Sequence, residues 1–331
     1  MPIASIVVPS YNAQATLPET LASLRVQSFQ DIEIIIVNDG STDDTARIAE
    51  AASAADPRIR VVTQLNRGLA GARNSGIAAA RGEFVGFCDA DDLWHPGKMA
   101  AHVAHLRQAT DVGLSYAGSR LIDMQSQPIG AVQKPRLSGV TAAHILKRNP
   151  IGNGSAPVMR REALQALAYR PRTEMERDWV FDETFRQSED IECWLRLALT
   201  TDWRIEGVEG FLTDYRLSPG GLSAATDRQL ASWERMIEKL LPLSPGFFAR
   251  HLGAARAYQL RYLARRAISD LDGPRAMRLV RQSLTQSVTP LVEEPIKTGI
   301  TMIAALVLLG GGAAALKFAM RGKASSPKTS A

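Results

Sequence analysis

The stretch FVGFCDADDLW, residues 84–94, places three carboxylates within four positions: Asp89, Asp91 and Asp92. Carboxylates this close repel one another, so they stay ionised only when cations or hydrogen-bond donors compensate their charge. Mg²⁺ and Mn²⁺ prefer oxygen ligands and typically take one or two carboxylates together with the phosphates of a substrate. The residues alone predict either a divalent-metal site or a turn in which Asp92 caps the helix that Pro96 begins.

Two other polar segments also follow apolar runs, and each has a structural and a functional interpretation. Asp39 in NDGST is either a turn residue before a helix capped by Ser41 or Thr42, or an acceptor of hydrogen bonds from a nucleoside. In VPSYN, Pro9 ends an apolar run, and Tyr11 either packs on the protein or stacks on a base. The residues themselves leave these alternatives open.

Two further segments contribute charge. Arg67 and Arg73 flank GLAGA at the start of an expected helix, where an arginine is suited to a diphosphate; the alternative is a solvated helix face. Glu189 and Asp190 stand in an expected first helical turn after Ser188, where the helix dipole favours acids. In the functional interpretation, one acid of this pair is a general base.

Motifs of several other enzyme classes are absent from the sequence. The five histidines show no ligand spacing such as HExxH, and GxSxG, GxxxxGK[ST] and GxGxxG do not occur. These absences argue against NTPases, serine hydrolases and dinucleotide-dependent oxidoreductases. Cys88 and Cys193 are too few for a disulfide framework or a zinc site, and we expect both to be buried thiols.

Alternating strand and helix signals position these residues. The expected strands are apolar runs at 4–9, 32–37, 58–62 and 83–87, and the expected helices lie at 17–27, 41–52 and 69–80. This alternation predicts βαβ units around a parallel sheet, which binds ligands at the carboxyl ends of its strands. PSYN, NDGS and DADD all fall at such ends, so we expect them to meet in one crevice.

Taken in order, these pieces resemble the inverting family-2 glycosyltransferases, which have a GT-A-type fold. The stretches that carry the resemblance are SIVVPSYNAQATLPETLASLRVQSFQDIEIIIVNDGSTDDT, NRGLAGARNSGIAAARGEFVGFCDADDLW, FDETFRQSEDIECWLRLA and YRLSPGGLS, within residues 3–224. Processive synthases of this family carry QxxRW after the base, whereas this chain has CWLRLA. The resemblance is therefore to non-processive members.

The resemblance implies an α/β fold, with a Rossmann-like nucleotide-sugar domain, a mostly parallel central sheet and a C-terminal helical region. The expected glycosyltransferase domain covers residues 1–225, with a nucleotide-binding half (1–117) and an acceptor half (118–225). The parts expected after it are a basic helical region (226–295) with a hairpin at Asp272-Gly273-Pro274, an apolar membrane-associating segment (296–320) and a disordered basic tail (321–331).

For the donor, the resemblance implies a UDP-sugar. Pro9, Tyr11 and Asp39 would hold the uridine, with Tyr11 near the base and Asp39 on the uracil. Arg73 would lie near the diphosphate.

The acid cluster corresponds to the DxD motif of the family. Asp91 would bind Mn²⁺ or Mg²⁺ that bridges the diphosphate. Asp89 would face the ribose or the sugar and is the second candidate metal ligand, whereas Asp92 would lie behind these two.

The same resemblance makes Asp190 the catalytic base. It would deprotonate an acceptor hydroxyl, whose oxygen attacks the anomeric carbon opposite the leaving UDP. A single displacement of this kind inverts the anomeric centre, so an α-linked donor gives a β-glycoside. Arg216 and Ser223 lie where the family closes a loop over the nucleotide.

Charge is distributed unevenly along the chain. Residues 227–331 hold 16 Lys/Arg and 7 Asp/Glu, a balance of +9, and the first 226 residues hold the remaining 23 and 27, a balance of −4. Residues 299–316 carry no charge and are flanked by Lys297, Lys317, Arg321 and Lys323. A basic region beside an apolar segment favours an anionic membrane surface over nucleic acid as a partner.

We therefore expect the protein at the cytoplasmic face of the inner (cell) membrane. In this interpretation, residues 299–316 span, dip into or lie on the bilayer; the alternative is a helix that packs on the protein. Because UDP-sugars are cytosolic, a cytoplasmic catalytic domain fits this placement.

The function predicted first is an inverting, metal-dependent hexosyltransferase that glycosylates a hydroxyl of a membrane lipid such as diacylglycerol. The candidate donors are UDP-glucose, UDP-galactose and UDP-glucuronate. Glucuronate is included because four arginines precede the base motif, although a solvated basic face explains them as well; they are Arg170, Arg172, Arg177 and Arg186. The alternative is a glycosyltransferase of exopolysaccharide or lipopolysaccharide repeat assembly that acts on a polyprenyl-linked or saccharide acceptor. A third alternative, a non-catalytic nucleotide-sugar-binding partner, is disfavoured because the acidic motifs are intact.

Overall fold

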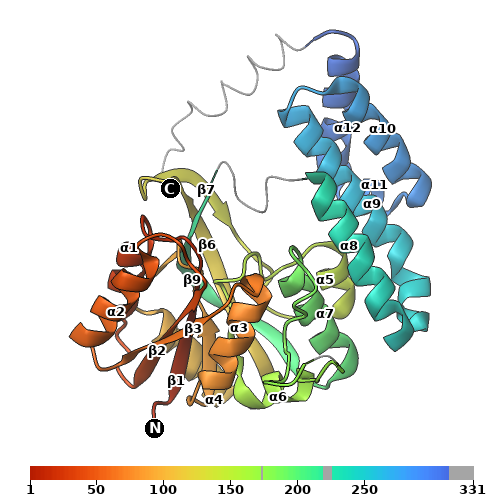
Figure 1. The fold of residues 1–331 in the computed structure, drawn as a ribbon. Coiled ribbons are helices and arrows are strands. Elements are labelled where there is room, and N and C mark those ends of the chain that lie inside the picture. The colour runs from red at the N-terminus through yellow and green to blue at the C-terminus, as the bar shows by residue number, and fades with distance from the viewer. Residues whose placement is uncertain (173, 219–225, 313–331) are drawn as a thin grey trace. The chain divides into compact units, whose positions relative to one another are not determined.

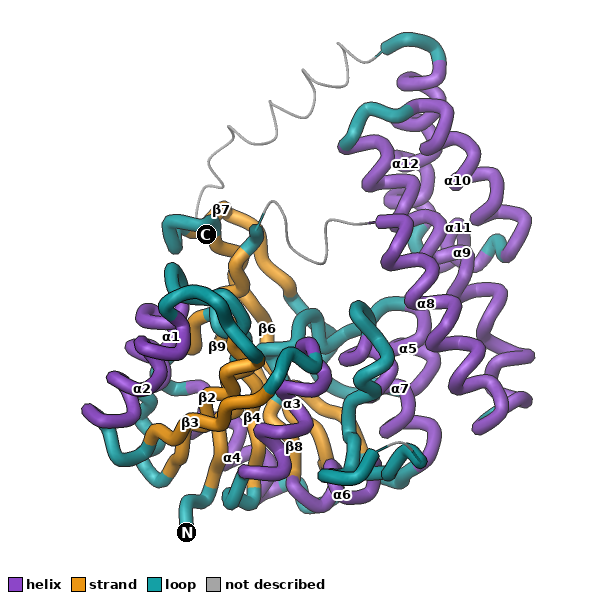
Figure 2. Tube along the Cα trace, in the orientation of Figure 1, coloured by secondary structure: helices purple, strands orange, loops and turns teal. Residues whose placement is uncertain are grey.

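The computed structural model describes residues 1–172, 174–218 and 226–312. The chain forms two compact units. The first comprises Met1–Ile145 and Asn149–Leu243, and the second comprises Leu146–Arg148 with the described residues from Ser244 onward. Figure 1 labels the elements of both units, and Figure 2 shows that the strands lie in the first unit and that the second unit is helical.

The N-terminal half of the first unit is a parallel sheet with the strand order β3-β2-β1-β4. Its strands are β1 (Ala4–Ser10), β2 (Ile32–Asp39), β3 (Ile59–Gln64) and β4 (Phe84–Phe87). β1, β2 and β4 are buried along their whole length, which explains why their sequences are largely apolar and do not alternate with polar residues. The predicted α/β domain with a mostly parallel sheet is confirmed.

Helices cover both faces of this sheet. They are α1 (Leu17–Arg25), α2 (Thr45–Ala55), α3 (Gly68–Ala79) and α4 (Lys98–Gln108). α1, α2 and α4 share a core with strand residues such as Ile6 and Ile34. α3 packs on the opposite face, where a Cβ at Gly76 would lie 2.1 Å from Cγ1 of Val7. Gly76 therefore lets α3, which carries Arg73, approach the sheet closely.

The sheet continues beyond β4 in the order β8-β6-β9-β5, and β7 pairs with β6. These strands are β5 (Leu93–Trp94), β6 (Val112–Ile122), β7 (Pro128–Gln133), β8 (Val158–Arg160) and β9 (Arg204–Arg216). β6 and β9 are parallel, whereas the other pairs in this half are antiparallel. Pairing of Leu93 with Asp214 brings the segment after the acid cluster next to Arg216.

Four helices accompany this half: α5 (Ala142–Lys147), α6 (Arg161–Leu167), α7 (Glu189–Thr200) and α8 (Thr226–Leu240). The sequence predicts the domain boundary at residue 225, but α8 belongs to the first unit and the units divide after Leu243. α8 is held there because Nζ of Lys239 lies 2.8 Å from carboxylate oxygens of both Asp182 and Glu192.

The second unit contains α9 (Pro245–Ser269), α10 (Gly273–Gln286), α11 (Thr289–Glu293) and α12 (Pro295–Leu309). α9 and α10 form the helical hairpin that the sequence predicts. The turn uses Leu271 at φ +61°, and Oδ1 of Asp272 caps α10 by accepting from the backbone N of Arg275 at 3.0 Å.

The apolar segment expected at 296–320 is described as far as residue 312, and the tail expected at 321–331 lies outside the described residues. In the described part of the chain, no helix has both the length and the hydropathy needed to cross a membrane.

Candidate active site

The acid cluster begins directly after β4, in the loop 88–92 that we call the acid loop. Of its three aspartates, Asp92 is the one with no exposed surface. Its Oδ2 accepts from Oγ of Ser155 at 2.5 Å, and its Oδ1 accepts from the backbone N of Arg216 at 2.9 Å. Burial and the charges of Asp91 and Asp89 raise the pKa of Asp92. Asp92 thus has a structural role, but not the capping role offered as an alternative, because α4 begins at Lys98 with Gly97 as its N-cap and has no side-chain cap.

Ser155 lies in the loop before β8, the neighbour of β4, and its hydroxyl group fixes the acid loop. Besides donating to Asp92, its Oγ accepts from the backbone N of Asp89 at 2.9 Å. Its own carbonyl accepts from Nε1 of Trp94 at 3.1 Å. Ser155 was not among the predicted site residues, because a serine in a Gly/Pro-rich loop carries no local signal for a partner 63 positions away.

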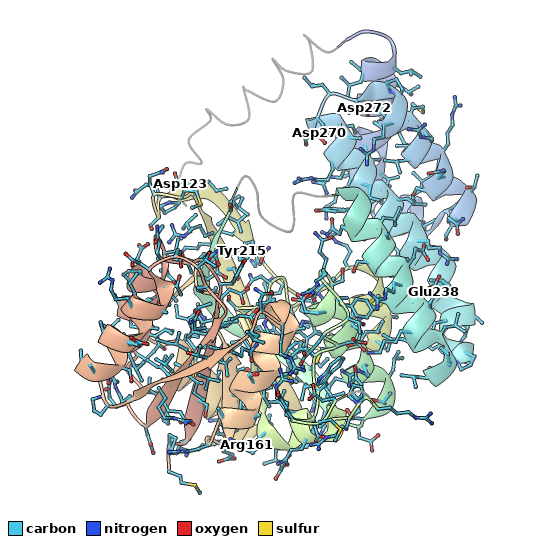
Figure 3. The ribbon with its side chains drawn as sticks, viewed as in Figure 1. Asp123, Arg161, Tyr215, Glu238, Asp270 and Asp272 are labelled. Carbon is cyan, nitrogen blue, oxygen red and sulfur yellow. The ribbon has the colours of Figure 1, made fainter. Side chains whose placement is uncertain are left out.

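Arg216 holds the same loop through its guanidinium group. Its Nε donates to the backbone carbonyl of Asp91 at 2.7 Å and its Nη2 to Oε2 of Glu19 at 2.8 Å. Arg216 follows Tyr215, labelled in Figure 3, and its Nη1 donates to the carbonyl of Asp123 at 3.0 Å. In this structure the arginine therefore positions the acid loop.

The predicted contact of Arg216 with a nucleotide stays a prediction. The other residue assigned to that loop, Ser223, lies outside the described residues.

Asp91 forms no ion pair with the described side chains, although the charge of Arg216 and a backbone hydrogen bond partly favour its ionised form. Burial and the neighbouring charge of Asp89 raise its pKa to about 6, against an ordinary value near 3.8. A half-buried carboxylate whose ionisation is disfavoured, with a second carboxylate beside it, is suited to a hard divalent cation. Among the described residues, no group of three or more His, Cys, Asp or Glu side chains could hold a metal ion. Oxygens of a bound diphosphate would have to complete such a site.

Arg73 connects the acid loop to the start of α7. Its Nη2 donates to Oδ1 of Asp89 at 2.8 Å, and its Nη1 donates to Oε1 of Glu189 at 2.8 Å. The arginine is only 2% exposed, and its guanidinium also lies over the ring of Phe181. Although burial opposes its charge, Asp89 and Glu189 keep the pKa of Arg73 above its ordinary value. The two acidic motifs thus meet around one buried cation.

Glu189 and Asp190 occupy the first turn of α7, where the helix dipole favours negative charge. Burial raises the pKa of Glu189 to about 7 and also raises the pKa of Asp190. Oδ1 of Asp190 accepts from the backbone N of Ile191 at 2.7 Å. Among the described side chains, no Lys or Arg forms an ion pair with Asp190, whereas Glu189 is bound to Arg73. Of the two acids, Asp190 is the one left available to a substrate.

The predicted uridine residues lie at the ends of two neighbouring strands. The β1–β2 register pairs Pro9 with Val37, so Tyr11 follows β1 beside the end of β2, whose last residue is Asp39. Tyr11 is 54% exposed. Oδ1 of Asn12 accepts from the backbone N of Thr42 at 2.9 Å and ties the two loops together. An exposed aromatic ring thus stands at this edge of the sheet.

Asp39 is 2% exposed and is engaged with the start of α3. Its Oδ1 accepts from the backbone N of Arg67 at 2.8 Å and from Nε2 of Gln64 at 2.6 Å, and its Oδ2 accepts from the backbone N of Gly68 at 2.8 Å. Asp39 thus holds the start of α3, a role that the sequence did not predict, and the helix expected after it begins at Thr45 rather than at Ser41 or Thr42. Hydrogen bonding of Asp39 to uracil stays a prediction.

The arginines near the base motif bind carboxylates of the chain itself. Arg177 lies 2.8 Å from Glu183, and Arg170 lies 2.7 Å from Asp178. Arg67 pairs with three acids, Glu174, Glu176 and Glu183, rather than facing solvent. Arg172 and Arg186 are exposed. Two of the four arginines proposed to bind a uronate carboxylate, Arg170 and Arg177, are therefore already in ion pairs within the protein.

Residues 5–167 match the model of the family described as Glycosyl transferase family 2. The chain is similar to the glycosyltransferase EpsJ of Bacillus subtilis (strain 168), itself described as uncharacterized, with 51% identity over 92 residues, 28% of this chain and 27% of that protein. It is also similar to the UDP-Glc:alpha-D-GlcNAc-diphosphoundecaprenol beta-1,3-glucosyltransferase WfgD of Escherichia coli, with 27% identity over 232 residues, 69% of this chain and 82% of WfgD. In three of the curated relatives, the match spans only 27%, 28% and 45% of the relative's own length.

Two solved structures share the fold. TarS 1-349 of S. aureus in complex with UDP-GlcNAc aligns with a TM-score of 0.61 and 16% identity over 94% of this chain and 92% of that chain. The mannosyltransferase PcManGT from Pyrobaculum calidifontis, in complex with GDP-Man and Mn²⁺, aligns with a TM-score of 0.58 and 20% identity over 95% and 87%. The GT-A-type fold predicted from the sequence is confirmed.

Proposed function

We propose that the protein transfers a hexose from a UDP-sugar to a saccharide or polyprenyl-linked saccharide acceptor, during assembly of a cell-surface polysaccharide. The premise is that residues 5–167 of the chain belong to glycosyl transferase family 2. The observation that carries the proposal is the bridge formed by Arg73. It joins the acid loop, through Asp89, to the Glu189-Asp190 pair. The acid loop, which would bind the sugar donor, and the pair that contains the proposed base therefore belong to one cluster of charged side chains.

The acceptor is inferred from the relatives. WfgD, which is named for a sugar linked to diphosphoundecaprenol, is similar over 82% of its length. This favours the alternative acceptor of the sequence analysis over a diacylglycerol acceptor. UDP-glucose heads the candidate donors for the same reason, ahead of UDP-galactose and UDP-glucuronate.

A divalent cation fits the acid loop, because Asp91 carries a carboxylate whose pKa of about 6 reflects burial beside Asp89 rather than pairing with a cation. In the proposed site, Asp91 and Asp89 hold Mn²⁺ or Mg²⁺ together with diphosphate oxygens. When bound, the cation neutralises negative charge that develops on the departing UDP. Ser155 and Arg216 hold the loop that presents the two carboxylates.

The proposed base is Asp190. Its carboxylate takes the proton of the acceptor hydroxyl while the hydroxyl oxygen forms a bond to the anomeric carbon of the donor. The bond from that carbon to the diphosphate oxygen breaks, and its electron pair leaves with UDP. Burial raises the pKa of Asp190, which makes it a better proton acceptor than an exposed aspartate. Glu189, bound to Arg73, keeps the start of α7 in place.

The test uses the purified full chain with Mn²⁺, a panel of UDP-sugars and three acceptor conditions: GlcNAc-diphosphoundecaprenol, diacylglycerol and no acceptor. UDP release and product mass are measured, and NMR of the product gives the anomeric configuration. We expect transfer to the diphosphoundecaprenol-linked sugar with a β-linkage. Transfer to diacylglycerol alone would replace the proposed acceptor, and absence of UDP release with every donor would refute the transferase assignment.

A further inference from the structure

Helix α12 is apolar on its exposed side as well as on its buried side, where Ala305 and Leu308 accompany two threonines. Its face toward α9 and α10 contains Thr298 and Thr301, which are 4% and 3% exposed. Its other face carries large aliphatic side chains. This aliphatic stripe consists of Ile296 (76% exposed), Ile300 (56%), Ile303 (63%), Leu306 (56%) and Val307 (37%). Spacing of three and four residues places these side chains on one side of the helix.

The orientation of α12 about its own axis is fixed by hydrogen bonds. Oγ1 of Thr298 donates to the carbonyl of Pro290 at 2.6 Å and accepts from Nη1 of the buried Arg261 at 2.6 Å. At the start of the helix, Glu294 pairs with Arg148 at 3.0 Å and with Arg261. If α12 rotated about its axis so that the stripe faced inward, these bonds would break. The hydrogen bonds therefore keep the stripe facing outward.

More exposed aliphatic side chains precede α12. Three further aliphatic side chains are exposed there: Val288 (59%), Leu291 (39%) and Val292 (74%). Glu294, at φ −137°, interrupts the helix between α11 and α12, so these side chains are exposed aliphatic residues of the segment just before α12. A contiguous apolar surface such as the stripe of α12 marks an interaction site, whereas single exposed residues do not.

The segment of the chain that contains α12 has a positive net charge. Residues 244–331 contain 13 Lys/Arg and 4 Asp/Glu, and no acid occurs after Glu294. Two of the four acids are used within the unit, since Glu293 lies 2.7 Å from Lys147 and Glu294 binds Arg148, Arg261 and Lys297. Several arginines are exposed: Arg250, Arg265, Arg278 and Arg281. Lys317, Arg321, Lys323 and Lys328 follow in the sequence.

We propose that the aliphatic stripe of α12 inserts into the interface of a bilayer that contains anionic phospholipid. The stripe runs along the helix, so α12 would lie along the bilayer surface with its aliphatic side chains among the acyl chains. The surplus of basic residues complements the lipid phosphates and distinguishes this partner from an apolar protein groove. The inference goes beyond the proposed transferase activity and does not depend on it. The predicted position at the cytoplasmic face of the cell membrane stays a prediction.

The test measures flotation of the full chain with vesicles of phosphatidylcholine alone and of phosphatidylcholine with about 30% phosphatidylglycerol. The triple variant I300Q/I303Q/L306Q removes aliphatic area at exposed positions, so the fold should persist by circular dichroism. Each aliphatic side chain transferred to lipid raises the vesicle partition coefficient on the order of tenfold. We therefore expect the partition coefficient of the triple variant to be roughly 100-fold or more below that of wild type. The control I129Q/V132Q, on β7 in the first unit, removes two aliphatic side chains that are 46% and 52% exposed and should bind as wild type.

Three outcomes would overturn the proposal. One is absence of vesicle binding by the wild-type protein, and another is equal binding by the triple variant. The third is a dimer in sedimentation equilibrium that the triple variant abolishes while neither protein binds vesicles, which would assign the stripe to a second copy. Equal binding to neutral and anionic vesicles would overturn the electrostatic part.

Discussion

Oγ of Ser155 lies 2.5 Å from Oδ2 of Asp92, and the same hydroxyl accepts from the backbone N of Asp89 at 2.9 Å. One side chain therefore fixes both ends of the segment that contains Asp91. Asp92 is fully buried, so it depends on this partner and on the backbone N of Arg216. The position of the proposed metal ligand is thus set by residues that would not touch the metal.

Replacing Ser155 with alanine should weaken metal-dependent UDP binding. The buried Asp92 loses one of its two donors and the backbone of Asp89 loses an acceptor, so the acid loop should sample other conformations. Groups that orient metal ligands typically contribute ten- to 100-fold to affinity, and we expect a Kd for Mn²⁺ roughly tenfold higher in calorimetry with UDP present. The free energy of unfolding should fall by about 1–3 kcal/mol, because a buried carboxylate has lost a hydrogen bond.

The matched control is S283A in α10, where Oγ donates to the carbonyl of Ala257 at 2.7 Å. Ser283 is also buried, at 4% exposed. The free energy of unfolding of S283A should fall by about as much as that of S155A, whereas its affinities for Mn²⁺ and UDP should be unchanged. If S155A and S283A behave alike in both measurements, Ser155 has no special role in the acid loop.

Metal removal should abolish transfer reversibly if Asp91 is the proposed metal ligand. We expect chelation by EDTA to stop UDP release and added Mn²⁺ to restore it. D91A should remain inactive with added Mn²⁺, and its UDP affinity should no longer depend on the metal in calorimetry. A D91A protein whose UDP binding is still enhanced by Mn²⁺ would contradict the assignment.

Asp190→Asn should separate catalysis from binding. The amide cannot accept the acceptor proton, and loss of a general base typically costs 10²- to 10⁴-fold, so kcat should fall on the order of 10³-fold. UDP and Mn²⁺ affinity should be unchanged, because Arg73 still holds Asp89 and Glu189.

The rate of sugar transfer by the Asp190→Asn variant is measured with a radiolabelled donor in reactions quenched at set times. Asp178→Asn serves as control, since this exposed acid in the preceding loop pairs only with Arg170 in the described part of the chain. Wild-type turnover by Asp190→Asn would rule out Asp190 as the base, and the same loss in Asp178→Asn would point to a general effect on the loop.

Local sequence patterns were sufficient for the parallel half of the sheet. β1, β2 and β4 are buried runs of apolar residues, and the polar segments after them meet at one edge because parallel strands share an orientation. The antiparallel additions β5, β7 and β8 have six residues or fewer and carry weak patterns. Their pairing depends on contacts between distant parts of the chain, so the second half appeared irregular in the sequence.

Roles within the site were harder to predict than its location. The sequence pointed to Arg73, but not to its simultaneous bonds to Asp89 and Glu189, which lie 16 and 116 positions away. Arg216 was expected at the nucleotide, yet its donors bind Asp91 and Glu19, 125 and 197 positions away. Such partners are chosen by the three-dimensional fold, and no local spacing encodes them.

The start of α12 should respond to pH through Glu294. Although burial opposes its ionisation, hydrogen bonds from Lys297 and Arg261 lower the pKa of Glu294 to about 2 from an ordinary value of 4.5. A carboxyl group whose pKa is lower in the folded state stabilises the fold fully above its unfolded pKa, and this contribution disappears as pH falls from 4.5 toward 2. E294Q should therefore be less stable than wild type at neutral pH, by about 1–2 kcal/mol after allowance for partial exposure to solvent.

Urea unfolding followed by far-ultraviolet circular dichroism, at several pH values between neutrality and about 3, measures this difference. It should shrink steadily below pH 4.5, because the wild-type carboxyl becomes protonated and then resembles the amide. Asp270→Asn, which changes an exposed acid of the same unit labelled in Figure 3, is the control variant. If the difference in unfolding free energy between E294Q and wild type stays constant down to pH 3, the ion pairs of Glu294 do not stabilise the start of α12. The orientation of α12 would then depend on Thr298 and the packed face alone.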